Sequence, residues 1–220
     1  MNTAKELKES TVIDVDFSQR TQTLKNARNA ILQLRKEKEM LLAEVEKLKH
    51  YQDLAYEDTL SGLMNRRAFD KDMSLEIARA SRKRDYTFSV LLIDLNDFKS
   101  INDQFGHKEG DATIQWVAHF LKSQVRLQDT VYRLGGDEFA VLLPDTPSRG
   151  ARVVMSRMME VLSLSNTARP HCVRMSIGAS TYKIDSLELH GLLDIADKRM
   201  YQSKNLQKKA ANQRKATINF

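Results

Sequence analysis

Apolar residues near the start of the chain recur at alternating intervals of three and four. With Leu24 at heptad position a, the a positions fall at 24, 31, 38, 45 and 52, and the d positions at 27, 34, 41, 48 and 55. Only Lys38 and Gln52 interrupt this seam, and no Gly or Pro occurs before Gly62. A 3.5-residue period over about four heptads predicts a coiled-coil helix at 18–56 that joins two chains. The alternative is a single amphipathic helix packed on its own domain.

After this helix, short apolar runs alternate with helical patterns, which predicts the element order αβααββαβα. The predicted strands cover about residues 88–95, 130–134, 137–143 and 173–181. The predicted helices cover about residues 66–84, 97–105, 111–125, 147–163 and 187–204. Strands separated by helices, with one hairpin among them, predict an α/β fold with a mixed central sheet and helices on both faces.

The Gly-Gly pair at 135–136 separates the second and third predicted strands and favours a hairpin, because type I′ turns need positive φ at both central residues. Asp137 and Glu138 open the strand after the turn, and Asp94 closes the earlier buried strand. Carboxylates at a sheet edge need a positive partner, and Mg²⁺ binds a few carboxylates together with substrate phosphates. The pattern suggests a metal-assisted phosphoryl-transfer site. A solvated hairpin tip is the alternative.

The formal net charge of +6 suggests a polyanionic partner, but its distribution along the chain argues against one. Residues 1–203 carry 30 basic and 29 acidic side chains, whereas residues 204–220 carry five basic side chains and no acidic one. The body of the protein is therefore nearly neutral. Nucleic-acid binding by the basic tail remains only a minor alternative.

Composition excludes several other classes of protein. With a single cysteine, Cys172, the chain forms no internal disulfide, and a structural zinc site is not expected. No apolar run approaches the ~20 residues of a membrane span, and residues 1–16 lack the apolar core of a signal peptide. We therefore expect a cytoplasmic protein without a membrane span.

Five motifs resemble those of one protein family, in the same order. The run Arg-Leu-Gly-Gly-Asp-Glu-Phe at 133–139 resembles the signature of the GGDEF family, the diguanylate cyclases. The other motifs lie at residues 58–69, 94–111, 176–178 and 196–204. Five ordered motifs make chance a poor explanation. The resemblance implies a GGDEF catalytic domain with the core of the nucleotidyl cyclases. The expected segments are a flexible 1–17, a coiled-coil dimerisation helix at 18–56, the catalytic domain at 57–208 and a basic tail at 209–220.

The resemblance implies that two GTP molecules condense into cyclic di-GMP and release two pyrophosphates across a homodimer. It also implies two Mg²⁺ ions per active site, with Mn²⁺ as the other candidate ion. The implied metal ligands are the carboxylates of Asp94, Asp137 and Glu138 and the carbonyl of Leu95. The implied catalytic residues are Gly135, Gly136, Asp137 and Glu138. The two glycines would let the hairpin backbone approach the nucleotide, and Glu138 would help to activate the 3′-hydroxyl.

Asn102 and Asp111 match the family's guanine-binding residues. Guanine presents N1–H and N2–H₂ donors, which a carboxylate accepts as a pair. The alternative for Asp111 is a helix N-cap. The remaining implied contacts to GTP are Phe98, Lys99, His107, Lys204 and Lys208.

Three departures from the family pattern stand out. Ser61 replaces a usual Thr, and Asn96 replaces a common Asp, for which we expect a minor effect. The usual Gly-Arg-Asn after Lys204 is replaced by Leu-Gln-Lys-Lys at 206–209. Lys208 then stands where an arginine would contact phosphate, and lysine supplies the charge without the bidentate fork. This substitution predicts weaker GTP binding.

An Arg-x-x-Asp pattern at Arg126 and Asp129 lies just before the Gly-Gly turn and matches the family's product-inhibition site, to which Arg157 would add a further arginine. Arginine pairs with phosphate and stacks on guanine, while aspartate accepts from the guanine edge. In this interpretation cyclic di-GMP is both product and allosteric inhibitor. A surface ion pair at a helix end is the alternative.

Two functions compete at this stage. One is an active diguanylate cyclase dimerised by its coil, and the other is a non-catalytic receptor that binds cyclic di-GMP or GTP. The complete acidic set of Asp94, Asp137 and Glu138 favours the cyclase.

Overall fold

The computed structural model describes the backbone of residues 3–166 and 171–218, and the side chains of residues 20–49, 51, 55–166 and 171–210. The chain divides into two compact units, Met1–Asp53 and Leu54–Phe220. In the described part of the chain, no helix combines the length and hydrophobicity of a membrane span.

Helix α1 (Thr3–Tyr56) confirms the long N-terminal helix. It begins within segment 1–17, which the sequence predicted to be flexible, because no Gly or Pro stops it there. Residues 1–2 of that segment lie outside the described residues. The apolar seam is exposed in the chain by itself at Leu24, Ile31, Leu34, Leu41, Val45 and Leu48. An exposed apolar stripe of this kind is typical of an interface.

The second unit is built on a four-stranded sheet in the order β2-β3-β1-β4. Its strands are β1 (Ser89–Asn96), β2 (Thr130–Gly135), β3 (Glu138–Leu143) and β4 (Arg174–Thr181). All three pairings between these strands are antiparallel, so the prediction of a mixed sheet is wrong. Each helical crossover does join two strands of the same direction, but another strand lies between them. The result is a split βαβ arrangement of the ferredoxin-like type.

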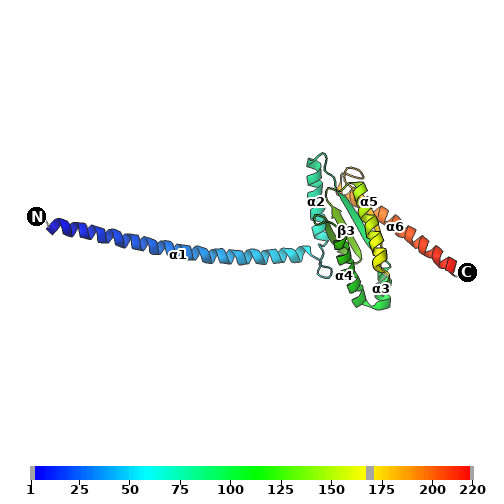
Figure 1. The fold of residues 1–220 in the computed structure, drawn as a ribbon, viewed down its shortest axis with the longest axis horizontal. Helices are drawn as coiled ribbons and strands as arrows, with labels where there is room; N and C mark the ends of the chain where they lie inside the picture. The colour runs from blue at the N-terminus through cyan, green and yellow to red at the C-terminus, as the bar shows by residue number, and fades with distance from the viewer. Residues whose placement is uncertain (1–2, 167–170, 219–220) are drawn as a thin grey trace. The chain divides into compact units, whose positions relative to one another are not determined.

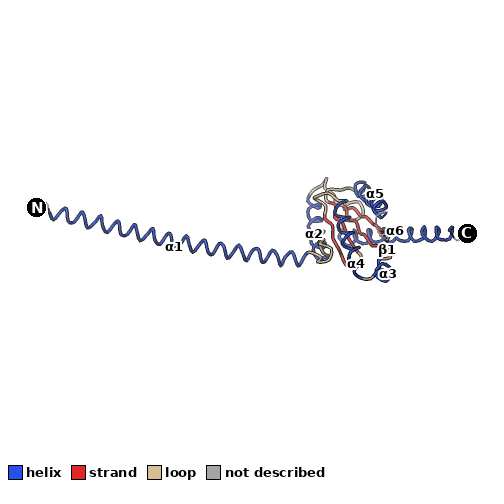
Figure 2. Tube along the Cα trace, turned by 60° about the horizontal axis from the view of Figure 1, so that its bottom comes forward, coloured by secondary structure: helices blue, strands red, loops and turns tan. Residues whose placement is uncertain are grey.

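Helices cover both faces of the sheet, as predicted (Figure 2). They are α2 (Arg66–Arg82), α3 (Phe98–Phe105), α4 (His107–Ser123), α5 (Ser148–Ser165) and α6 (Leu189–Ile218). Helices α4 and α5 pack on one face, and α2 and α6 pack on the other. The helices and strands of the second unit pack around two apolar clusters.

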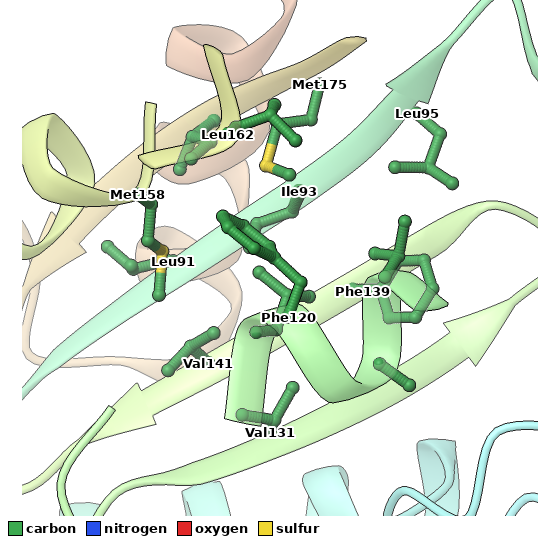
Figure 3. Close-up of a cluster of buried hydrophobic side chains, with 14 of the residues drawn as sticks. Leu91, Ile93, Leu95, Phe120, Val131, Phe139, Val141, Met158, Leu162 and Met175 are labelled. Carbon is green, nitrogen blue, oxygen red and sulfur yellow. The ribbon is translucent and has the colours of Figure 1, made fainter. Parts of the chain in front are cut away.

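The central strand β1 is buried on both faces, which explains its continuous apolar run. Leu91, Ile93 and Leu95 point toward the cluster formed with α4 and α5 (Figure 3). Val90 lies in the opposite cluster, with Phe69 of α2. Because side chains alternate along the strand, β1 contributes to both apolar clusters, and its last residues lie at the edge of both.

Helix α6 lies directly on β4 because Gly178 has no side chain. A Cβ at Gly178 would lie 2.0 Å from the backbone oxygen of Ala196. The helix continues to Ile218, past the end that the sequence predicted at Lys204, and extends beyond the sheet (Figure 1). Most of the predicted tail 209–220 is thus helical, because Gln207 stands where a helix-ending glycine was usual. Residues 219–220 lie outside the described residues.

Candidate active site

The predicted acidic residues meet where the β2–β3 hairpin lies beside the end of β1. Asp94 and Glu138 are direct partners in the β1–β3 ladder, and the amide of Leu95 donates to the carbonyl of Asp137 at 3.1 Å. Asp94 and Glu138 share the face that α2 and α6 cover, since side chains alternate along a strand. The structure therefore places Asp94, Leu95, Asp137 and Glu138 at one edge of the sheet.

Lys204 reaches this edge from α6. Its ammonium Nζ lies 2.6 Å from Oδ1 of Asp94, and the two side chains are only 25% and 15% exposed. A carboxylate with so little exposure needs a positive partner, and Lys204 supplies it here. The residue predicted to bind phosphate thus contacts the residue predicted to bind metal.

The free carboxylates at this edge are compatible with a divalent cation. Asp137 is half-buried and Glu138 is exposed, and neither side chain has a hydrogen-bond partner among the described residues. No cluster of three or more His, Cys, Asp or Glu side chains suited to a metal occurs in the described ranges. The described side chains by themselves offer too few ligands for a closed metal site. This fits Mg²⁺, which binds one or two carboxylates and completes its shell with water and substrate phosphates.

The hairpin turn differs from the one that the sequence predicted. Gly135 still belongs to β2 and pairs with Glu138, so the central turn residues are Gly136 and Asp137. Only Gly136 has positive φ, at +40°, which is typical of a type II′ rather than a type I′ turn. A register shift between Arg133 and Gly135 causes the difference, because a bulge adds one residue to β2. The bulge moves Asp137 into the turn.

Arg133 anchors this turn, a role that the motif analysis did not assign. Its Nε and Nη2 donate to the carbonyl of Gly136 at 3.0 and 2.8 Å, and its Nη1 donates to Oδ1 of Asp58 at 2.9 Å. Asp58 also accepts from the amide and hydroxyl of Ser61 at 2.8 and 2.6 Å. Ser61 thus keeps the hydroxyl that a threonine would offer. The first motif and the GGDEF motif are therefore one hydrogen-bonded unit.

The electrostatics of Asp58 follow from these contacts. Burial by itself would raise the pKa of its carboxyl, but the hydrogen bonds from Ser61 and Arg133 outweigh burial and lower the pKa. Asp58 is therefore held as a carboxylate under the turn. It was missed as a functional residue because its partner Arg133 is distant in sequence.

The proposed guanine-binding residues lie at the junction of α3 and α4. Gly106, with φ +85°, separates the helices and takes the N-cap position of α4, so the N-cap alternative for Asp111 is wrong. Asp111 is exposed in the second turn of the helix. Asn102 lies against Gly110, where a Cβ would come within 1.8 Å of its Oδ1. The structure thus places Asn102 beside the turn of α4 that carries Asp111.

The turn between β1 and α3 leads into the N-terminus of α3. Asp97 has the left-handed φ of +59° and precedes Phe98 and Lys99, the first residues of α3. Amides in the first turn of a helix lack intrahelical acceptors, and they suit an anion such as phosphate. His107, also predicted to contact GTP, is exposed at the first residue of α4.

Two of the departures from the family pattern contact each other. Asn96 donates through Nδ2 to Oε1 of Gln207 at 2.8 Å and accepts from the hydroxyl of Ser176 at 2.9 Å. Gln207 in turn donates to the carbonyl of Met175 at 3.0 Å. Asn96, which we expected to have a minor effect, therefore ties α6 to the sheet. Lys208 follows, exposed, at the next position of α6.

The predicted inhibitory residues also gather in space. The amide of Arg126 donates to Oδ2 of Asp129 at 2.8 Å, and Arg157 of α5 donates to the carbonyl of Gln124. Burial raises the pKa of Asp129, partly offset by the Arg126 hydrogen bond and by the charges of Arg126 and Arg157. Its Oδ1 is buried and has no hydrogen-bond partner among the described residues. A buried acceptor without a donor is costly unless a ligand supplies one.

Comparison with known proteins identifies the same family as the sequence motifs. The family model "Diguanylate cyclase, GGDEF domain" matches residues 55–210. Diguanylate cyclase VdcA of Vibrio cholerae is 36% identical over 198 residues, which are 87% of this chain and 55% of that protein. Response regulator PleD of Caulobacter vibrioides is 38% identical over 162 residues, which are 71% of this chain and 36% of that protein. The chain spans roughly a fifth to just over half of the length of the curated relatives that it matches.

Solved structures match the fold as well. The crystal structure of the coiled coil and GGDEF domain of DgcB from Caulobacter crescentus, in complex with c-di-GMP, superposes with a TM-score of 0.71 at 25% identity. The match covers 79% of this chain and 93% of that chain. Ordered motifs, a split antiparallel sheet and the family match over residues 55–210 together show that this chain belongs to the GGDEF-domain diguanylate cyclase family.

Proposed function

We propose that this protein is a diguanylate cyclase that condenses two GTP molecules into cyclic di-GMP and releases two pyrophosphates. The observation that carries the proposal is the meeting of Asp94, Asp137 and Glu138 at one sheet edge, with Lys204 on Asp94. In each half of the reaction, a 3′-oxygen bonds to the α-phosphorus of the other GTP while the bond to pyrophosphate breaks. The hydroxyl proton is lost at the same step.

The residues at the edge fit a divalent metal, and the carboxylates of Asp94, Asp137 and Glu138 and the Leu95 carbonyl would hold it. When bound, Mg²⁺ or Mn²⁺, two per site, would neutralise phosphate charge and lower the pKa of the 3′-hydroxyl. Glu138, opposite Asp94 and exposed, would accept the hydroxyl proton at its carboxylate. Lys204 would exchange Asp94 for a phosphate oxygen of the incoming nucleotide.

The α3–α4 junction would bind the guanine base. The Asp111 carboxylate would accept from N1–H and N2–H₂, and Asn102 would contact the base from the end of α3. The amides of Phe98 and Lys99 at the start of α3 would bind phosphate oxygens, and Lys204 and Lys208 would add positive charge.

Two chains would have to meet for the reaction. The exposed apolar seam of α1 supports a homodimer, because Leu24 through Leu48 present apolar side chains that a second copy would cover. Tethering two GTP-loaded domains raises the effective concentration of one for the other.

The turn at Arg126 and Asp129 would bind product. Oδ1 of Asp129 is buried and has no hydrogen-bond partner among the described residues, which supports this role, since a guanine N–H is a donor of the required kind. Arg126 and Arg157 would pair with the phosphates of cyclic di-GMP.

The test is incubation of the dimeric protein with GTP and MgCl₂, followed by mass spectrometry for cyclic di-GMP. We expect product and two equivalents of pyrophosphate. A protein that is dimeric by light scattering and binds GTP but makes no product would contradict the proposal and favour a non-catalytic receptor.

A further inference from the structure

A groove of about 870 Å³ opens at the end of the sheet, beyond β1 and at the beginning of β4. Helices α5 and α6 bound it. Six of its polar and charged lining residues matter here: Asn96, Asp97, Ser100, Arg174, Gln207 and Lys208. The groove therefore adjoins the turn at the start of α3, whose amides suit an anion.

Residues along helix α6 contact the last residues of β1 one after another. Lys204 contacts Asp94 at 2.6 Å, and Gln207 contacts Asn96 at 2.8 Å. Lys208, the next residue, lines the groove. The side-chain amide of Gln207 accepts from Asn96 and donates to the carbonyl of Met175, so it is bonded to both β1 and β4. These bonds hold α6 on the sheet past Lys204 and bring Lys208 to the groove.

Arg174 enters the same groove from β4. It is the direct partner of Asn96 in the β1–β4 ladder. Its Nη2 lies 2.9 Å from Oδ2 of Asp97, the residue whose left-handed backbone precedes the first turn of α3. The two side chains are 52% and 49% exposed, so this ion pair contributes little and can exchange. The other nitrogens of the guanidinium have no partner among the described residues.

We propose that Arg174 binds the terminal phosphates of GTP and supplies the guanidinium that Lys208 lacks. This inference rests on the proposed function, because it takes GTP as the nucleotide at the Asp94 edge. A phosphate would replace Asp97 at Nη2 and also take the unpartnered nitrogens, a bidentate geometry that lysine cannot offer. The arginine missing from α6 is thus replaced from a different element of the fold.

The experiment measures nucleotide binding without turnover. 3′-Deoxy-GTP lacks the attacking hydroxyl and cannot react, and GMP lacks the terminal phosphates. Both are titrated into the full chain with Mg²⁺ by calorimetry. We expect Arg174→Ala to weaken 3′-deoxy-GTP binding about tenfold and to change GMP binding less than about twofold. Arg174→Lys should recover part of the loss, since it keeps the charge.

Two further variants separate phosphate binding from support of the turn. Arg82→Ala, which removes an exposed arginine at the end of α2, is the matched control and should leave both affinities unchanged. Asp97→Asn removes the ion pair but tolerates the left-handed backbone. If Arg174 binds phosphate, Asp97→Asn leaves 3′-deoxy-GTP binding unchanged or tighter, and Arg174→Ala still weakens it in that background.

Three results would overturn the assignment. These are unchanged 3′-deoxy-GTP binding in Arg174→Ala, equal losses for 3′-deoxy-GTP and GMP, or the same loss in Asp97→Asn as in Arg174→Ala. Failure of the proposed activity is a separate result. A wild-type dimer that binds 3′-deoxy-GTP but makes no cyclic di-GMP contradicts the cyclase, while the comparison of the two nucleotides still decides the role of Arg174.

Discussion

Asp94 and Asp129 are both half-buried carboxylates, but their surroundings differ. Oδ1 of Asp94 contacts the ammonium of Lys204. Asp129 instead accepts a backbone amide from Arg126 at one oxygen, and its other oxygen is buried without a partner among the described residues. The first site therefore holds an ion pair, and the second holds a buried carboxylate oxygen without a hydrogen-bond donor among the described residues. We infer that one is built for exchange of charge and the other for a hydrogen-bond donor.

The largest expected effect is at Glu138, the ladder partner of Asp94 in the first site. Glu138→Gln keeps the size of the side chain but removes the charge that would accept the 3′-hydroxyl proton. We expect cyclic di-GMP synthesis to fall on the order of a thousandfold, as for loss of a general base. The residue is exposed, so the circular dichroism spectrum and melting temperature should not change. Turnover close to wild type would contradict the role of Glu138.

The cation at the first site is tested by Lys204→Met, which keeps the apolar stem and removes the ammonium. We expect the KM for GTP to rise about tenfold, because a charge-assisted contact to phosphate is lost. The matched control is Lys209→Met, an exposed lysine farther along α6. An equal effect of both variants would mean that only the general charge of α6 matters.

The second site is tested by Arg126→Ala. Loss of the guanidinium should raise the cyclic di-GMP concentration needed for half inhibition about tenfold, measured against the initial rate of the same variant. Arg82→Ala serves again as the control. Inhibition that is unchanged in Arg126→Ala would restore the alternative of a plain surface turn.

The smallest expected effect is a pH dependence of product binding. Burial raises the pKa of Asp129, so its carboxylate takes up a proton at a higher pH than a free aspartate, which has a pKa of about 3.9. Protonation removes an acceptor, and cyclic di-GMP should therefore bind more weakly as the pH falls toward the raised pKa. Calorimetry at successive pH values below neutral should show a loss of affinity in the wild type that Asp129→Asn lacks. Equal losses would assign the pH dependence to another group.

Much of the fold was predictable from local patterns. The apolar run at 88–95 predicted β1 within one residue, because a strand buried on both faces is apolar throughout. Strand direction was not predictable in the same way. The crossovers suggested parallel neighbours, but β3 and β1 each insert between the strands that a crossover joins. The turn was also mistaken in detail, because the bulge before Gly135 depends on how β2 pairs with β3.

The candidate site, like the fold, was predictable from the sequence only in part. The acidic residues were found because they stand together in motifs, and the structure places them at one edge. Arg174 belongs to none of the motifs, and a single arginine in a strand does not indicate which residues lie near it in the fold. Its relation to Asp97 and Lys208 depends on the β1–β4 register and on the path of α6.

The sequence by itself determined the family, the long N-terminal helix, the helices on both faces and the acidic set at the hairpin. These follow from periodicity and short motifs, which are local properties of the chain. Only the tertiary structure decided that Lys204 contacts Asp94, that Gln207 contacts Asn96 and that Oδ1 of Asp129 is buried without a partner in the described part of the chain. The physical reason is that such contacts join residues far apart in the chain. They form only when strand register and helix packing bring the two backbones together.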